Sequence, residues 1–137
     1  MMKAILIITI TVFLLCGCNS YNREVVGKWE FVPQEDVHGS GSETLEIRDN
    51  MTYHNRFRVL FDVTQNSECV ININTEGRWE QEGDSLFFNG HTIAESNFLD
   101  HNQEYGSRKR YKIESCSDRE LVLSNDSAKN MKYVRIE

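Results

Sequence analysis

The sequence predicts an all-β fold, an antiparallel up-and-down barrel of about eight or nine strands. Apolar and polar residues alternate along most of the chain, which is typical of strands with one buried face. Gly, Asn, Asp and Ser residues that favour turns separate these runs. Helical spacing is almost absent from residues 25–137, so no helix is expected to cover the apolar face of the sheet. Closure into a barrel then buries that face and removes the sheet edges.

Nine runs rich in β-branched and aromatic residues are the expected strands. Short polar turns such as Asp49-Asn50, Glu82-Gly83-Asp84 and Ser117-Asp118 join several of them, which favours antiparallel hairpins. The expected strands are residues 26–32, 43–49, 52–63, 68–73, 77–81, 85–89, 109–115, 120–123 and 131–136.

The longest of these runs, residues 52–63, shows the alternation clearly. Tyr53, Phe57 and Phe61 share one parity, whereas Arg56 and Arg58 share the other. Because successive side chains of a strand point to opposite faces, one face of this strand is predicted to be buried and the other to face water.

Two segments interrupt the pattern. Residues 33–42, which include Gly39-Ser40-Gly41-Ser42, are predicted to form a flexible loop. The apolar residues of segment 90–107 are not regularly spaced, so this segment is predicted to be an irregular connection. The alternatives are a short strand, a helical turn or a lid.

The N-terminus has the features of a secretory signal peptide. Lys3 precedes an apolar run over residues 4–15, which is shorter than the ~20 residues that a membrane-spanning helix needs. Leu15-Cys16-Gly17-Cys18 resembles the lipobox of bacterial lipoproteins, and this implies cleavage after Gly17 and acylation of Cys18. The expected organisation is a signal peptide (1–17), a lipidated cysteine with a short tether (18–24) and one barrel domain (25–137). An ordinary secretory signal with an incidental cysteine is the alternative.

The expected location is the cell envelope, on the periplasmic face of the outer membrane. Two or three acyl chains on Cys18 would anchor the chain to the lipid bilayer almost permanently. Residues 19–24 have no Asp directly after the cysteine and no acidic cluster. In bacterial lipoproteins, an Asp directly after the cysteine is a signal for retention at the inner membrane, and an acidic cluster is a signal for export to the cell surface. The resemblance to these lipoproteins therefore implies that the chain moves to the outer membrane and stays on its periplasmic face.

The charge balance disfavours nucleic acid and anionic lipid surfaces as partners. The 137-residue chain carries 15 Lys and Arg against 21 Asp and Glu, a net charge of −6, and loss of Lys3 with the signal peptide makes it −7. The local basic runs, Arg56/Arg58 and Arg108-Lys109-Arg110, are interpreted as solvated faces of strands.

Two cysteines, Cys69 and Cys116, remain after processing. An exported protein folds in a compartment that permits disulfides. A bridge between them would add about 3–5 kcal/mol of stability, and the sequence leaves open whether it forms.

Two Gly-x-Trp motifs, Gly27-Lys28-Trp29 and Gly77-Arg78-Trp79, resemble those of lipocalin-like domains. Leu45-x-Ile47 followed by Asp49-Asn50 resembles the strand–turn–strand pattern of the same family, although Asn50 replaces the usual turn glycine. The resemblance places the chain among small bacterial lipocalin-like lipoproteins. It implies that Trp29 plugs the closed end of the barrel and that Gly27 gives the backbone room to pass it.

No catalytic or metal-binding motif is present. The histidines His38, His54, His91 and His101 are scattered, no serine lies in a Gly-x-Ser-x-Gly motif, and Gly39-Ser40-Gly41 lacks the helix start of a phosphate loop. We therefore expect no enzyme activity, no metal and no cofactor.

Two functions fit these observations. The first is binding of a small hydrophobic ligand inside the barrel, although the same aromatic side chains would also serve simply to fill it. The second is a solid barrel that contacts another envelope protein, as a partner or inhibitor, through acidic loop residues. The candidate lining residues are Tyr53, Phe57, Phe61, Trp79, Phe88 and Tyr111, and the acidic loop residues are Glu35, Asp36, Glu95, Asp100 and Glu104.

Overall fold

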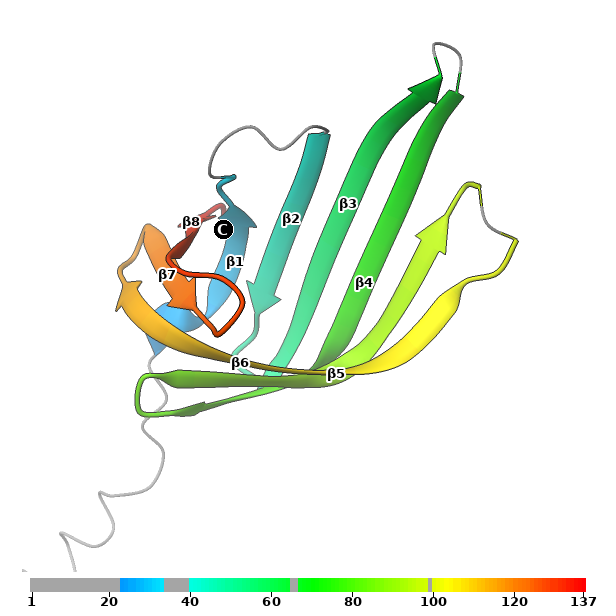
Figure 1. Ribbon diagram of the computed structural model, residues 1–137. Helices are drawn as coiled ribbons and strands as arrows, with labels where there is room; N and C mark the ends of the chain where they lie inside the picture. The colour runs from blue at the N-terminus through cyan, green and yellow to red at the C-terminus, as the bar shows by residue number, and fades with distance from the viewer. Residues whose placement is uncertain (1–22, 34–39, 65–66, 99) are drawn as a thin grey trace, which may run out of the picture.

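The computed structural model describes residues 23–33, 40–64, 67–98 and 100–137. Eight strands form a closed barrel in sequence order, each antiparallel to the next, and the last strand pairs with the first. The predicted antiparallel up-and-down barrel is therefore confirmed (Figure 1). A short 3-10 helix, η1 (Arg23–Val25), precedes the strands β1 (Gly27–Phe31), β2 (Ser40–Ile47), β3 (Thr52–Thr64), β4 (Ser67–Glu82), β5 (Ser85–Ser96), β6 (Gln103–Cys116), β7 (Glu120–Ser124) and β8 (Met131–Arg135).

The strand β4 is one continuous strand, whereas the sequence predicted two, over residues 68–73 and 77–81. The polar residues between them look like a turn in the sequence. In the structure Thr75 is instead buried and pairs with Asn55 of β3 and Thr92 of β5, so the ladder continues through it. The described residues therefore form eight strands, one fewer than the nine expected runs.

The segment 90–107 was predicted to be an irregular connection, but most of it forms regular strands. Its two ends belong to β5 and β6, which pair without interruption from Ser85 with Lys112 to Ala94 with Gln103. The segment was predicted to be irregular because its apolar residues are not regularly spaced, yet Gly90 and Gly106 both lie within paired strands. Similarly, β2 begins at Ser40, inside the segment predicted to be a loop.

The barrel is closed at one end and open at the other. The strands β3 to β6 have 12 to 16 residues each, whereas β1, β7 and β8 have five. The short strands meet the long ones only near one end, which we call the closed end. Beyond them the long strands continue as a broad curved sheet, which we call the open end (Figure 1).

The hydrophobic core fills the closed end. Both tryptophans, Trp29 and Trp79, are fully buried in it. The indole N–H of Trp29 donates to the Val25 carbonyl at 2.9 Å, and that of Trp79 donates to the Arg48 carbonyl at 2.7 Å. The other buried apolar residues are Val25, Leu45, Ile47, Tyr53, Leu86, Phe88, Leu121, Leu123 and Tyr133.

Arg135 of β8 holds the start of the barrel together. Its guanidinium lies over the Trp29 ring, 4.3 Å from the centroid, and donates to the carbonyls of Val26 and Glu24 at 2.8 Å each. Gly27 has a φ of 153°, and a β-carbon there would collide with the Arg135 guanidinium. A glycine at this position therefore permits the close approach of Arg135 to the turn that leads into β1.

The two cysteines are free thiols that lie at opposite ends of the sheet. Cys69 pairs with Phe61 at the open end, whereas Cys116 pairs with Leu121 beside the core. A disulfide requires Cα atoms within about 7 Å of each other, so the bridge that the sequence left open is not formed.

The signal peptide, the lipobox and Cys18 lie outside the described residues. None of the helices in the described ranges is long and apolar enough to cross a membrane.

Candidate functional site

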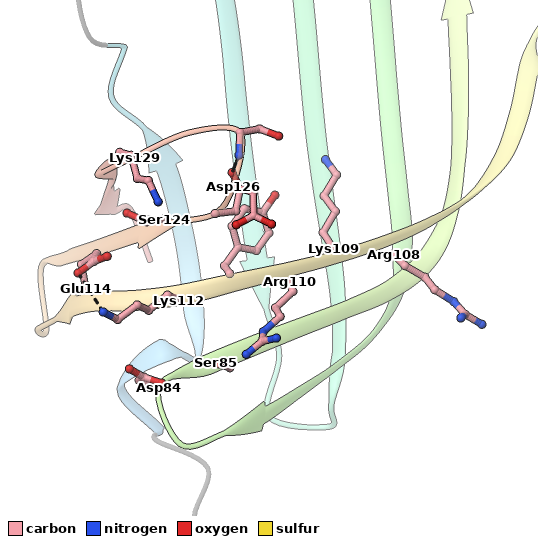
Figure 2. Close-up of a pocket in the computed structure, with 13 residues that line it drawn as sticks. Asp84, Ser85, Arg108, Lys109, Arg110, Lys112, Glu114, Ser124, Asp126 and Lys129 are labelled. Atoms are coloured by element: carbon pink, nitrogen blue, oxygen red, sulfur yellow. Dashed lines mark hydrogen bonds and ion pairs between the residues drawn. The ribbon is translucent and has the colours of Figure 1, made fainter.

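A belt of polar side chains lies inside the barrel directly above the core. We call this set the polar belt. Asn55 of β3 donates to a carboxylate oxygen of Glu43 of β2 at 2.9 Å, and the Tyr133 hydroxyl of β8 lies 3.5 Å from the same oxygen. Lys109 of β6 lines the same interior space, and its side chain extends to the opposite side of β6 from Arg108 and Arg110 (Figure 2). The polar belt consists of Glu43, Asn55, Ser107, Lys109, Tyr111 and Tyr133.

Three buried or half-buried tyrosines supply neutral hydroxyls to this interior. Burial, and then the nearby Glu43 carboxylate and Tyr53, raises the pKa of Tyr111 to about 12. Burial also raises the pKa of Tyr53 and, together with Glu43, that of Tyr133. These phenols therefore stay protonated at neutral pH and can donate hydrogen bonds to a ligand.

The aromatic rings beneath the belt are packed against each other. Phe88 contacts Tyr53 and Tyr111 edge to face, with ring centroids 4.7 Å and 5.7 Å apart. The space left between these rings and the belt has a volume of about 20 Å³. That volume holds about one water molecule, so the described residues of the closed end form a filled core with no room for a ligand.

Above the belt, the concave face of the long strands carries apolar side chains. We call these residues the apolar platform. Phe57, Ile73 and Ala94 form one row across β3, β4 and β5, and Val59 and Ile71 extend it towards the tips of the strands. All five side chains are half-buried. A buried hydrogen bond of 2.8 Å between the hydroxyls of Thr75 and Thr92 separates the platform from the core.

The structure divides the predicted lining residues into three groups. Tyr53, Phe88 and Tyr111 line the small interior space, and Phe57 lies on the apolar platform. Trp79, the sixth predicted lining residue, is fully buried at the closed end and is not among the residues that line the small interior space. The side chain of Phe61 lies outside the part that the structure describes.

Sequence reasoning missed the charged members of the belt, Glu43 and Lys109. The signal was present, because Glu43 has the inward parity of Leu45 and Lys109 has that of Tyr111. A charged side chain normally faces solvent, and the basic run that contains Lys109 was predicted to be a solvated strand face.

No group of three or more His, Cys, Asp or Glu side chains that could hold a metal ion occurs in the described residues.

No protein-family model and no curated protein matches the sequence. Among solved structures, the chain resembles a lipocalin-like protein from Bacteroides thetaiotaomicron, with a TM-score of 0.50. The two share 18% sequence identity, and the match covers 82% of this chain and 97% of that one. At this identity the match establishes a shared fold, the lipocalin-like barrel, and nothing further.

Proposed function

We propose that this protein binds a small amphipathic ligand at the open end of its barrel. The apolar part of the ligand would lie on the platform of Phe57, Ile73 and Ala94, and its polar end would meet the belt at Glu43 and Lys109. The observation that carries the proposal is this order of surfaces: an apolar platform leads inward to a polar belt, above a filled core. The lipocalin-like fold is consistent with such a role.

The platform supports a ligand with an alkyl chain or a flat apolar ring system. Each methylene group that leaves water gains about 0.8 kcal/mol. The belt offers both a carboxylate and an ammonium group, together with the neutral hydroxyls of Tyr111 and Tyr133. A polar end of either charge, or a neutral one, therefore finds a complementary group there.

Native mass spectrometry of the delipidated mature chain tests this proposal. We expect one bound molecule from a panel of fatty acids, alkyl amines and sterols. Ile73→Glu places a charge on the platform and should abolish binding, whereas Asn72→Glu, on the other face of the same strand, should leave it unchanged. Failure of the whole panel to bind, or equal loss in both variants, would refute the proposal.

A second candidate function is a protein-interaction or inhibitor role for a solid barrel. The filled closed end favours it, because a barrel without an enclosed cavity does not need an interior ligand. Exposed acidic residues at the open end, Glu95, Asp100 and Glu104, would face a basic partner. Glu35 and Asp36 lie outside the described residues. A pull-down from an envelope fraction that weakens with added salt would support this role over ligand binding.

We further propose that the protein acts in the cell envelope by binding, without catalysis, while anchored through acylated Cys18. The lipobox resemblance supports this anchor. Cells that express the wild-type chain and are fed a clickable palmitate should label it, whereas Cys18→Ser should remain an unlabelled, uncut precursor. Label retained by Cys18→Ser would place the lipid elsewhere.

A further inference from the structure

One stretch of β6 has a free edge. In the described part of the chain, β7 pairs with β6 only from Lys112 onward, and no strand covers that side of residues 103–111. The Ile113 N–H donates to the Asp84 carbonyl, so the backbone of Ile113 faces β5. Because backbone direction alternates along an antiparallel strand, the N–H and C=O groups of Gly106, Arg108 and Arg110 face outward from the sheet.

This edge borders an open groove along residues 108–112. A β-carbon built at Gly106 would point out of the plane of the sheet and would have no atom within 4 Å, so the outer face is open there as well. Exposed edge strands with unpaired backbone groups are templates for another extended chain, and proteins usually cover or distort them. The strand β6 instead pairs with β5 over ten consecutive residues without a bulge, although it curves (Figure 1).

A groove rich in cations runs beside this edge. It lies between β6 and the turn from β7 to β8 and has a volume of about 860 Å³ (Figure 2). Five cations line it against three carboxylates. Of these five, only Lys112 forms an ion pair within the described residues, with Glu114 at 3.9 Å. The cations are Arg108, Lys109, Arg110, Lys112 and Lys129, and the carboxylates are Asp84, Glu114 and Asp126.

We propose that the edge of β6 binds an extended acidic segment of a partner protein, which adds to the sheet as a further strand. The segment would take up the side of β6 that β7 leaves uncovered beyond Ser124. Main-chain hydrogen bonds to Gly106, Arg108 and Arg110 would supply affinity, as in other cases of strand addition. Carboxylates on the segment would meet the cations of the groove and fix its register.

The charges favour an acidic partner over a second copy of this chain. Antiparallel pairing of two copies about Gly106 would place Glu104 opposite Arg108 of the other copy. It would supply no carboxylate for Lys109, Arg110 or Lys129. The free backbone groups also favour a peptide over a nucleic acid or an anionic lipid, which would use only the cations.

Binding of a synthetic peptide to the ¹⁵N-labelled mature chain tests this proposal. The probe is an acetylated and amidated peptide of about seven residues in which Glu and Val alternate, a length typical of a strand. Its control is the same peptide with alternate backbone nitrogens methylated, which keeps the charges and removes the hydrogen bonds. Polyglutamate and vesicles with anionic lipid serve as non-specific polyanions.

The expected result is slower hydrogen exchange at the amides of Gly106, Arg108 and Arg110. The amides of Ser107 and Lys109, which face β5, should change little. Arg108→Gln combined with Arg110→Gln should weaken binding about tenfold. The same pair of changes at Arg56 and Arg58, exposed arginines on the interior strand β3, should change it by less than about twofold.

Gly106→Pro provides a variant that keeps every charge. It removes one outward N–H at an edge position, where proline is tolerated, and should abolish protection by the probe. No binding of the probe would overturn the proposal. Equal binding of the methylated peptide, or equally tight binding of the polyanions without amide protection, would also overturn it and assign the groove to polyanions in general.

Discussion

At the scale of single residues, Trp29 is the side chain on which the closed end most depends. It is fully buried beneath Arg135 and bonded to the Val25 carbonyl. Trp29→Ala should lower the free energy of unfolding by about 3–5 kcal/mol because it leaves a cavity in the core. Trp29→Phe keeps most of the ring volume but leaves the buried Val25 carbonyl without its donor. It should therefore lower the free energy of unfolding by about 1–3 kcal/mol.

Urea titration of both Trp29 variants measures these costs. Trp79→Ala is the matched comparison, and it should be destabilised to a similar degree because Trp79 is also fully buried in the core. A Trp29→Ala protein as stable as its parent would contradict the role of Trp29 as the plug of the barrel.

The interior tyrosines predict a loss of stability at alkaline pH. The pKa of Tyr111 is raised to about 12, above the unfolded value of about 10. As the pH rises, the unfolded chain therefore loses its phenolic proton first. The contribution of Tyr111 to stability should be constant below about pH 9 and fall between about pH 10 and 12. Tyrosinate absorbance and urea titration check this, and Tyr111→Phe should reduce the slope; a flat profile to pH 12 would contradict it.

At the scale of elements, the long strand β4 is joined to β5 by the buried hydroxyl pair Thr75 and Thr92. Thr75→Val leaves the Thr92 hydroxyl without its partner and should cost about 1–3 kcal/mol. Changing both residues to Val removes the two polar groups together and should recover most of that loss. A double variant that is less stable than the single one would show that the hydroxyl pair is not the source of the effect.

The sequence predicted most accurately those strands in which apolar and polar side chains alternate strictly. Residues 52–63, where Tyr53 and Phe57 alternate with Arg56 and Arg58, are an example. The prediction failed at Thr75 and Gly90, because a polar or small residue inside a strand looks like a turn until its partner strand is known. Pairing is a long-range property, and it overrides the local preference of these residues.

The candidate site was predictable only in part, for the same reason. The aromatic residues Tyr53, Phe88 and Tyr111 stand out by type and do line the interior. The parity of Glu43 and Lys109 shows that each faces inward, but no local pattern shows that β2 and β6 bring the two side chains to the same interior space. The free edge of β6 likewise depends on where β7 ends.

At the scale of the whole molecule, the two thiols lie too far apart to form a disulfide. Cys69 lies at the open end and Cys116 at the closed end. In protein purified from an oxidising compartment, Cys69 and Cys116 should therefore both be free thiols that react with Ellman's reagent in denaturant. Burial raises the pKa of Cys116, so in the native state its thiol should react slowly. A chain 2 Da lighter with no free thiol would contradict this arrangement.

The molecule is thus asymmetric along the barrel axis, with a filled core at one end and a curved sheet at the other (Figure 1). Stability resides in the short strands and the core of Trp29 and Trp79. Binding, in the function proposed here, resides in the part of the long strands that the short ones leave uncovered.

Paramagnetic broadening of methyl signals by a stearate with a nitroxide on its chain tests the central claim most directly. The platform predicts strong broadening at Val59, Ile71 and Ile73, and little at Val70 and Ile93, which lie on the outer face of the same strands. Equal broadening on the two faces, or no broadening on the concave face, would contradict ligand binding at the open end of the barrel.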